Sequence, residues 1–61
     1  MNIHNKKITS YLEKELVATS SEIARMLNVS WNTAEKYLLE LALERKVRRI
    51  KKEGVNLWIK E

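Results

Sequence analysis

The side chains of this 61-residue chain that are best suited to chemistry are cations, and they gather near its end. Residues 45–61 carry seven Lys or Arg and two Glu, a balance of +5, whereas residues 1–44 have a balance of −1. Lys and Arg bind phosphate by displacing the counterions that surround a duplex. A charged strand edge that prevents aggregation would show a similar run, so the run alone leaves both interpretations open.

A second set of polar side chains comes earlier, on one face of a predicted helix. The chain from Trp31 to about Arg45 has the apolar spacing of a helix. The polar side of this helix collects Asn32, Thr33, Lys36 and Glu40. Amide and ammonium groups donate hydrogen bonds to base edges and to phosphates. This face therefore predicts contact with nucleic acid.

Catalytic and metal-binding chemistry has little support in the sequence. Cysteine is absent and His4 is the only histidine, which excludes a disulfide framework, a zinc cluster of Cys and His ligands, and a thiol nucleophile. The glutamates are dispersed among lysines, and no serine has an acid–base neighbour in sequence that would activate it. We therefore expect no enzyme, no metal, no cofactor and no small-molecule ligand.

The first element that must position the polar residues is an amphipathic helix. Ile8, Leu12 and Leu16 recur at four-residue spacing, which predicts a helix over residues 5–16. The helix should end near the β-favouring residues 17–18. A short strand after the first helix is therefore an optional addition to the fold.

A tight helix-turn-helix follows. Thr19 and Glu22 have the spacing of a capping box, which predicts the start of a second helix. Residues 28–30 interrupt this helix early, and the Ser30 hydroxyl can cap the third helix.

The third helix has one apolar side and one anomaly. Its apolar side is formed by Ala34, Leu38, Leu41 and Ala42. Leu39 and Leu43 lie beside the polar face, where a simple amphipathic helix would carry charge. We therefore expect another apolar side chain to pack against these two leucines.

Residues 47–60 form two β-type segments joined at Gly54, the only glycine. The alternating residues predicted to share one face of the hairpin are Val47, Val55, Leu57 and Ile59, with Arg49 as a candidate fifth member. Trp58 then points to the opposite face, nearer to the third helix and its ligand. We expect the Trp58 indole to pack on Leu39 as its apolar neighbour. A surface Trp or an ordinary core Trp is the alternative.

These elements predict an α+β fold in which three helices precede a two-stranded hairpin. A chain of this size forms a single domain over residues 1–61, near the lower limit for folding on one hydrophobic core. The apolar runs are only two or three residues long, far short of the roughly 20 that span a bilayer. We expect a soluble, cytoplasmic protein.

From Thr19 to Glu61 the chain resembles the winged helix-turn-helix family, which includes many transcription regulators of archaea and bacteria. The similarity is carried by Ser21-Glu22-Ile23-Ala24-Arg25-Met26-Leu27-Asn28-Val29-Ser30, then by Asn32-Thr33-Ala34 and Leu38-x-x-Leu41, and finally by the hairpin of residues 47–60. The resemblance implies that the third helix is a recognition helix that enters the major groove of DNA. It also implies that the hairpin, called the wing below, contacts the adjacent phosphates.

One branch of this family binds Z-form nucleic acid, and the chain matches that branch only in part. The pair Leu57-Trp58 matches a Leu-Trp pair in the wing of that branch. Leu39 stands where those proteins have a Tyr, Glu35 stands where they have an Asn, and no Pro-Pro precedes the pair. The polar groups that read Z-DNA are therefore missing, and only the packing of Trp58 on the third helix is expected to carry over.

The expected function is binding of double-stranded DNA, by a transcription regulator or another DNA-associated factor. The candidate nucleic-acid-binding residues are Ser30, Asn32, Thr33, Lys36, Arg48, Lys51 and Lys52. The alternative is a protein-interaction module that docks through Leu39, Leu43 and Trp58. We expect a monomer in solution, with pairing on DNA left open.

Overall fold

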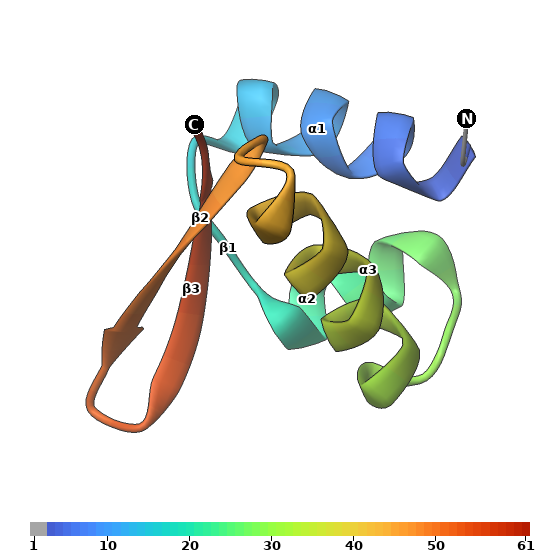
Figure 1. Ribbon diagram of the computed structural model, residues 1–61. Helices are drawn as coiled ribbons and strands as arrows, with labels where there is room; N and C mark the ends of the chain where they lie inside the picture. The colour runs from blue at the N-terminus through green and yellow to red at the C-terminus, as the bar shows by residue number, and fades with distance from the viewer. Residues whose placement is uncertain (1–2) are drawn as a thin grey trace.

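The computed structural model describes residues 3–61, and these residues form three helices and three strands (Figure 1). In chain order they are α1 (Ile3–Glu15), β1 (Ala18–Thr19), α2 (Ser20–Leu27), α3 (Trp31–Leu43), β2 (Val47–Lys52) and β3 (Val55–Lys60). The predicted α+β fold class, including the optional short strand after the first helix, is confirmed.

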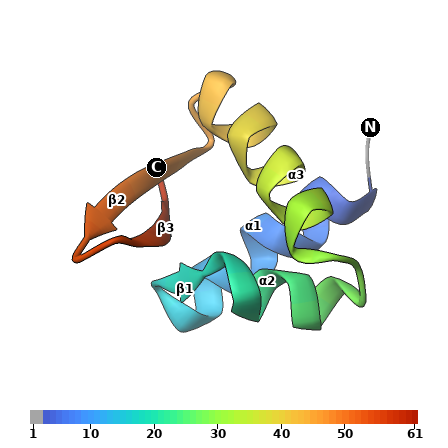
Figure 2. The same ribbon diagram turned by 90° about the horizontal axis from the view of Figure 1, so that it is seen from below.

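The three strands form one antiparallel sheet in the order β1-β3-β2. Strand β1 pairs with only the central part of β3, so the far end of the β2–β3 hairpin has no third strand. Figure 2 shows this hairpin projecting away from the helices. At its tip Glu53 and Gly54 both have positive φ, 50° and 80°, as a two-residue type I′ turn requires.

Helix α1 is shorter at its end than the apolar spacing predicts. Ile8 and Leu12 are buried as expected, but Leu16 lies beyond the helix and is 72% exposed. Its backbone is left-handed with a φ of 73°, and its amide donates to the Leu12 carbonyl at 2.9 Å. This terminal turn directs Leu16 out of the apolar stripe, so its predicted place in the core was wrong.

The predicted caps of α2 and α3 are both present. The Thr19 hydroxyl accepts from the Glu22 amide at 3.1 Å, and the Thr19 amide donates to the Glu22 carboxylate at 2.8 Å. The Ser30 hydroxyl accepts from the Thr33 amide at 3.2 Å. Asn28 takes the left-handed conformation, with a φ of 58°, that ends α2. These local bonds define where α2 and α3 begin and where α2 ends.

Helix α3 ends at Leu43, slightly before the predicted boundary. Arg45 has a φ of 61°, and the Lys46 amide donates to the Leu41 carbonyl at 2.9 Å. Such a bond closes the last turn of a helix and reverses the chain. The reversal leads directly into β2, where Val47 is buried.

Trp58 belongs to the hydrophobic core, because none of its surface is exposed. In the hairpin register Arg49 lies opposite Trp58, so these two residues share a face, on which Val47 also lies. Val55, Leu57 and Ile59 therefore project from the other face, together with Ile50. The predicted alternation was wrong, because large aliphatic residues occupy the outer face of the wing.

The core itself gathers residues from all three helices and all three strands. Its members are Ile8, Leu12, Ala18, Ile23, Ala24, Leu27, Ala34, Leu38, Leu41, Val47 and Trp58. Trp58 is the largest of those that are fully enclosed. One indole therefore fills the space between the sheet and the helices.

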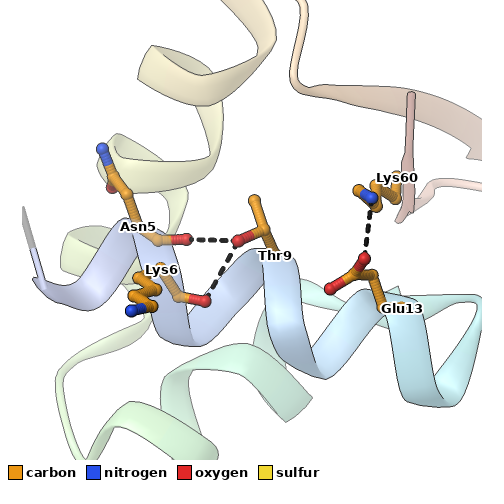
Figure 3. A network of polar contacts seen from close by, with 5 residues as sticks. All are labelled: Asn5, Lys6, Thr9, Glu13 and Lys60. Atoms are coloured by element: carbon orange, nitrogen blue, oxygen red, sulfur yellow. Dashed lines mark hydrogen bonds and ion pairs between the residues drawn. The ribbon is translucent and has the colours of Figure 1, made fainter.

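An ion pair joins the end of β3 to α1, as Figure 3 shows: the Lys60 ammonium lies 2.8 Å from the Glu13 carboxylate. One turn earlier in α1, the Thr9 hydroxyl donates to the carbonyl oxygens of Asn5 and Lys6, at 3.2 and 3.0 Å. The ion pair is exposed, so it adds little to stability. Within residues 3–61, no helix has the length and apolar character needed to cross a membrane.

Candidate nucleic-acid interface

The polar face of α3 is open to solvent at the positions chosen from the sequence. Asn32 and Lys36 are exposed, and Thr33 is partly buried. The hydroxyls of Ser30 and Thr33 lie 2.8 Å apart and partner each other at the start of the helix. Figure 1 shows that this start and the tip of the wing both lie away from α1. The start of the helix, which carries these polar residues, thus lies at the end of the molecule that also holds the wing tip.

The cations of the wing divide between its two faces. Lys51 lies opposite Asn56 and shares the inner face with Arg49 and Trp58. Arg48 and Lys52 project from the outer face, opposite Ile59 and Val55. Lys51 therefore lies on the face of the hairpin that packs toward the helices, and Arg48 and Lys52 lie on the face that points away from them.

These cations have few competing partners. The Arg48 guanidinium lies 4.0 Å from the Glu61 carboxylate, in a pair whose side chains are both exposed. Across residues 3–61, no carboxylate forms an ion pair with Lys36, Lys51 or Lys52. An exposed pair such as that of Arg48 is weak and easily exchanged for a phosphate.

A buried chain of hydrogen bonds connects the wing to α3. The Trp58 indole N–H donates to the Ser20 hydroxyl at 2.8 Å, and Ser20 donates in turn to the Glu35 carboxylate. Ser20 is only 3% exposed and its bond to Trp58 is buried, whereas its bond to Glu35 is partly buried. The expected direct packing of Trp58 on the third helix is therefore absent, and an indirect polar link through Ser20 of α2 takes its place.

Leu39 and Leu43 stay uncovered. Leu39 is 43% exposed and Leu43 is 85% exposed, whereas Trp58 is enclosed in the core. The Trp58 indole thus does not shield Leu39 from water as the sequence predicted. A docking patch made of Leu39, Leu43 and Trp58 is also wrong as predicted, because a buried indole offers no surface to a partner.

Between the wing and the starts of α2 and α3 lies a hollow of about 290 Å³. Its lining includes Trp31, Lys51 and Asn56, together with the hydroxyl-bearing residues Ser21 and Thr19. Trp31 is the first residue of α3, and half of its surface is exposed. The hollow thus joins the recognition helix to the inner face of the wing.

Several residues of this region were not singled out from the sequence. Trp31 lies at the margin of the apolar stripe of α3, and only its exposure reveals that it faces the hollow. Asn56 becomes a neighbour of Lys51 through the hairpin register. That register could have been deduced by placing the two-residue turn at Glu53 and Gly54. Ser20 gave no signal, because a serine beside a cap is common at the start of a helix.

The solved structures that resemble this chain in fold include a Zalpha domain and ZitR. A Zalpha domain from Carassius auratus PKZ, solved in complex with Z-DNA, has a TM-score of 0.87 at 17% identity, covering 95% of this chain and 92% of that one. Lactococcus lactis ZitR, solved as a C30AH42A mutant, has a TM-score of 0.84 at 22% identity, covering 100% of this chain and 43% of that one. No protein-family model and no curated protein matches the sequence.

At these identities the similarity concerns the fold alone. The shared features are the three helices, the short strand after α1 and the C-terminal hairpin. With its capped helix-turn-helix followed directly by a basic hairpin, this protein has the winged helix-turn-helix fold.

Proposed function

We propose that the protein binds double-stranded DNA, with α3 in the major groove and the wing on the adjacent phosphates. The observation that carries this proposal is the open polar face of α3 next to a projecting basic hairpin. Asn32 and Lys36 are exposed on the helix, and Lys51 and Lys52 are exposed on the wing. An α-helix fits the major groove, where amide and ammonium groups can reach base edges.

The wing carries cations on both of its faces, which supports contact with phosphates from both faces. Lys51 on the inner face is placed for the phosphates closest to α3, and Arg48 and Lys52 on the outer face for more distant ones. With the helix contributing Lys36 and the positive end of its dipole at the capped start, about five phosphates would be contacted. Each such contact releases condensed counterions, which makes affinity fall steeply with salt.

A titration of labelled random duplex at several salt concentrations tests the proposal. The plot of log affinity against log salt should have a slope near −4 to −5, the value for about five phosphates. A slope near zero would contradict binding through the cations. A second titration with a duplex held in the Z form tests whether the similarity to the Zalpha domain extends to binding of Z-DNA.

We expect no preference for the Z form. Glu35, at the position where the Z-binding branch has an Asn, is engaged by the Ser20 hydroxyl. Leu39, at the position of the Tyr, has no polar group. A marked preference for the Z form over the random duplex would contradict this assignment.

Whether the protein acts as a sequence-specific transcription regulator or as an architectural factor depends on base readout by Asn32. An amide on a recognition helix can bond adenine at two atoms, which discriminates between bases. Selection of bound duplexes from a random pool tests this role. An enriched common sequence supports a regulator, and an unchanged pool supports an architectural role.

The alternative function, docking of a protein partner, retains one supporting observation. Leu43 is 85% exposed and Leu39 lies one turn before it on the same helix. An apolar docking surface would respond little to salt, so the titration above separates the two functions. We expect a monomer in the absence of DNA, and sedimentation showing a tight dimer would contradict that expectation.

A further inference from the structure

We propose that the hollow between the wing and α3 receives one unpaired base of a bound nucleic acid. In this site the base stacks on Trp31 and its phosphate lies on Lys51. The proposal rests on the proposed DNA binding by α3 and the wing, and it adds a preference for DNA that offers an unpaired base.

Trp31 supplies the stacking surface. The residue starts α3, is 50% exposed and is not a member of the buried core. The residue also lines the hollow, and its exposure leaves aromatic surface available to a ligand. Stacking of a base on an aromatic side chain tolerates any sequence, because each base has a flat π surface.

The wing supplies the polar contacts. Lys51 and Asn56 are directly opposite each other in the hairpin, so both side chains leave the same face and both line the hollow. The ammonium of Lys51 has no carboxylate partner within residues 3–61 and can hold a phosphate. The Asn56 amide and the Ser21 hydroxyl can exchange hydrogen bonds with the edge of a base.

The size and charge of the hollow favour a single nucleotide. A volume of about 290 Å³ lies just below the range for pockets of drug-sized ligands, which is about 300–1,000 Å³. Lys51 is the one charged residue of the lining, so the site favours an anion. The hollow is continuous with α3 through Trp31, the residue that precedes Asn32, so a base held there belongs to the DNA on the recognition helix.

One wall of the hollow is held by hydrogen bonds. Ser20 contributes to the lining, and its hydroxyl is bonded to both Trp58 and Glu35. A preformed wall lowers the ordering cost of binding a small group. A stacked base can therefore add affinity without a rearrangement of the wing.

The test compares two labelled duplexes with identical paired sequence, one blunt and one with a short single-stranded overhang. Wild type should bind the overhang duplex about tenfold more tightly, the effect expected for one stacked base. In Trp31→Leu the ratio of the two affinities should fall to about one, whatever the change in affinity for the blunt duplex. Trp31→Phe keeps an aromatic ring and should retain most of the preference.

Tryptophan fluorescence supplies an independent measurement. The overhang duplex should quench emission in wild type more than the blunt duplex does, and Trp31→Leu should remove this difference. Circular dichroism checks that each variant is folded, and the exposure of Trp31 makes both substitutions tolerable.

Equal affinity of wild type for the two duplexes would overturn the proposal, as would a Trp31→Leu variant that still prefers the overhang. Free deoxyadenosine monophosphate that binds as tightly as the overhang duplex would show a site for free nucleotides instead. Failure of the proposed function has a different result, because wild type would then not bind the blunt duplex.

Discussion

The two tryptophans of this chain lie in contrasting surroundings. Trp58 is fully enclosed, and its indole nitrogen is bonded to Ser20. Trp31 is half exposed, and its ring borders a hollow beside a lysine. The same side chain thus closes the core in one region and faces a candidate ligand site in the other.

This difference teaches how a small domain divides its aromatic residues. With 61 residues the protein has a stability of only about 3–9 kcal/mol, on the usual range per residue. An enclosed indole contributes a large share of that free energy, whereas a half-exposed one contributes little. Mutations in the two regions should therefore separate stability from binding.

The largest expected effect is that of Trp58→Ala. Removing an enclosed aromatic side chain costs about 3–5 kcal/mol, which is enough to leave much of the protein unfolded at room temperature. The matched control is Trp31→Ala, which should cost less than about 1 kcal/mol. Urea denaturation followed by circular dichroism measures both, and similar losses for the two variants would break the comparison.

Asn32→Ala is the next largest in expected effect, and it should act on binding alone. The free energy of binding to the preferred DNA sequence should weaken by about 1–3 kcal/mol, because the Asn32 amide contacts base edges. Arg48→Ala should instead weaken binding to all duplexes alike and flatten the salt slope by about one. If both variants behave alike on preferred and random DNA, α3 does not read bases.

Ser20→Ala should lower stability moderately, because it removes the hydrogen bonds that link the wing to α3. The substitution leaves the Trp58 indole N–H and the Glu35 carboxylate without their shared partner, at a cost of about 1–3 kcal/mol. The exposed neighbour Ser21 gives the control Ser21→Ala, which should be close to neutral in stability. Thermal melts of the two variants test this, and an equally small change in both would show that the buried chain of bonds is unimportant.

The smallest predicted effect concerns the wing tip. Glu53 has a φ of 50°, a conformation that Asn tolerates better than Glu does. Glu53→Asn should therefore raise stability by about 0.5 kcal/mol, within the range of turn and glycine effects. Glu53→Gln removes the same charge without favouring the turn and should leave stability unchanged. Equal melting temperatures for the Asn and Gln variants would contradict the role of the turn.

The sequence predicted the helical half of the molecule well, because its signals are local. The Thr19 and Glu22 capping box and the Ser30 cap act within three residues, and each appears as expected. The burial of Trp58, on the same face as Val47, was missed for a different reason. Which side of a hairpin faces the core depends on packing between distant elements, and the outer face here carries enough aliphatic residues to mislead the alternation.

The candidate site shows the same limit. Exposure of Asn32 and Lys36 follows from helical periodicity, which the sequence displays directly. The hollow beside Trp31 depends on where the wing tip lies relative to the start of α2, a tertiary relation with no local signal. Whether the chosen residues contact DNA is a prediction that only binding measurements can test.

The central claim is that α3 and the wing form one DNA-binding surface. NMR amide shifts recorded while a short blunt duplex is added test this claim most directly. The largest changes should fall on residues 30–36 of the recognition helix and on residues 48–52 of the wing, with little change in α1. Changes centred on Leu39 and Leu43, or none at concentrations that saturate other DNA-binding domains, would contradict the account.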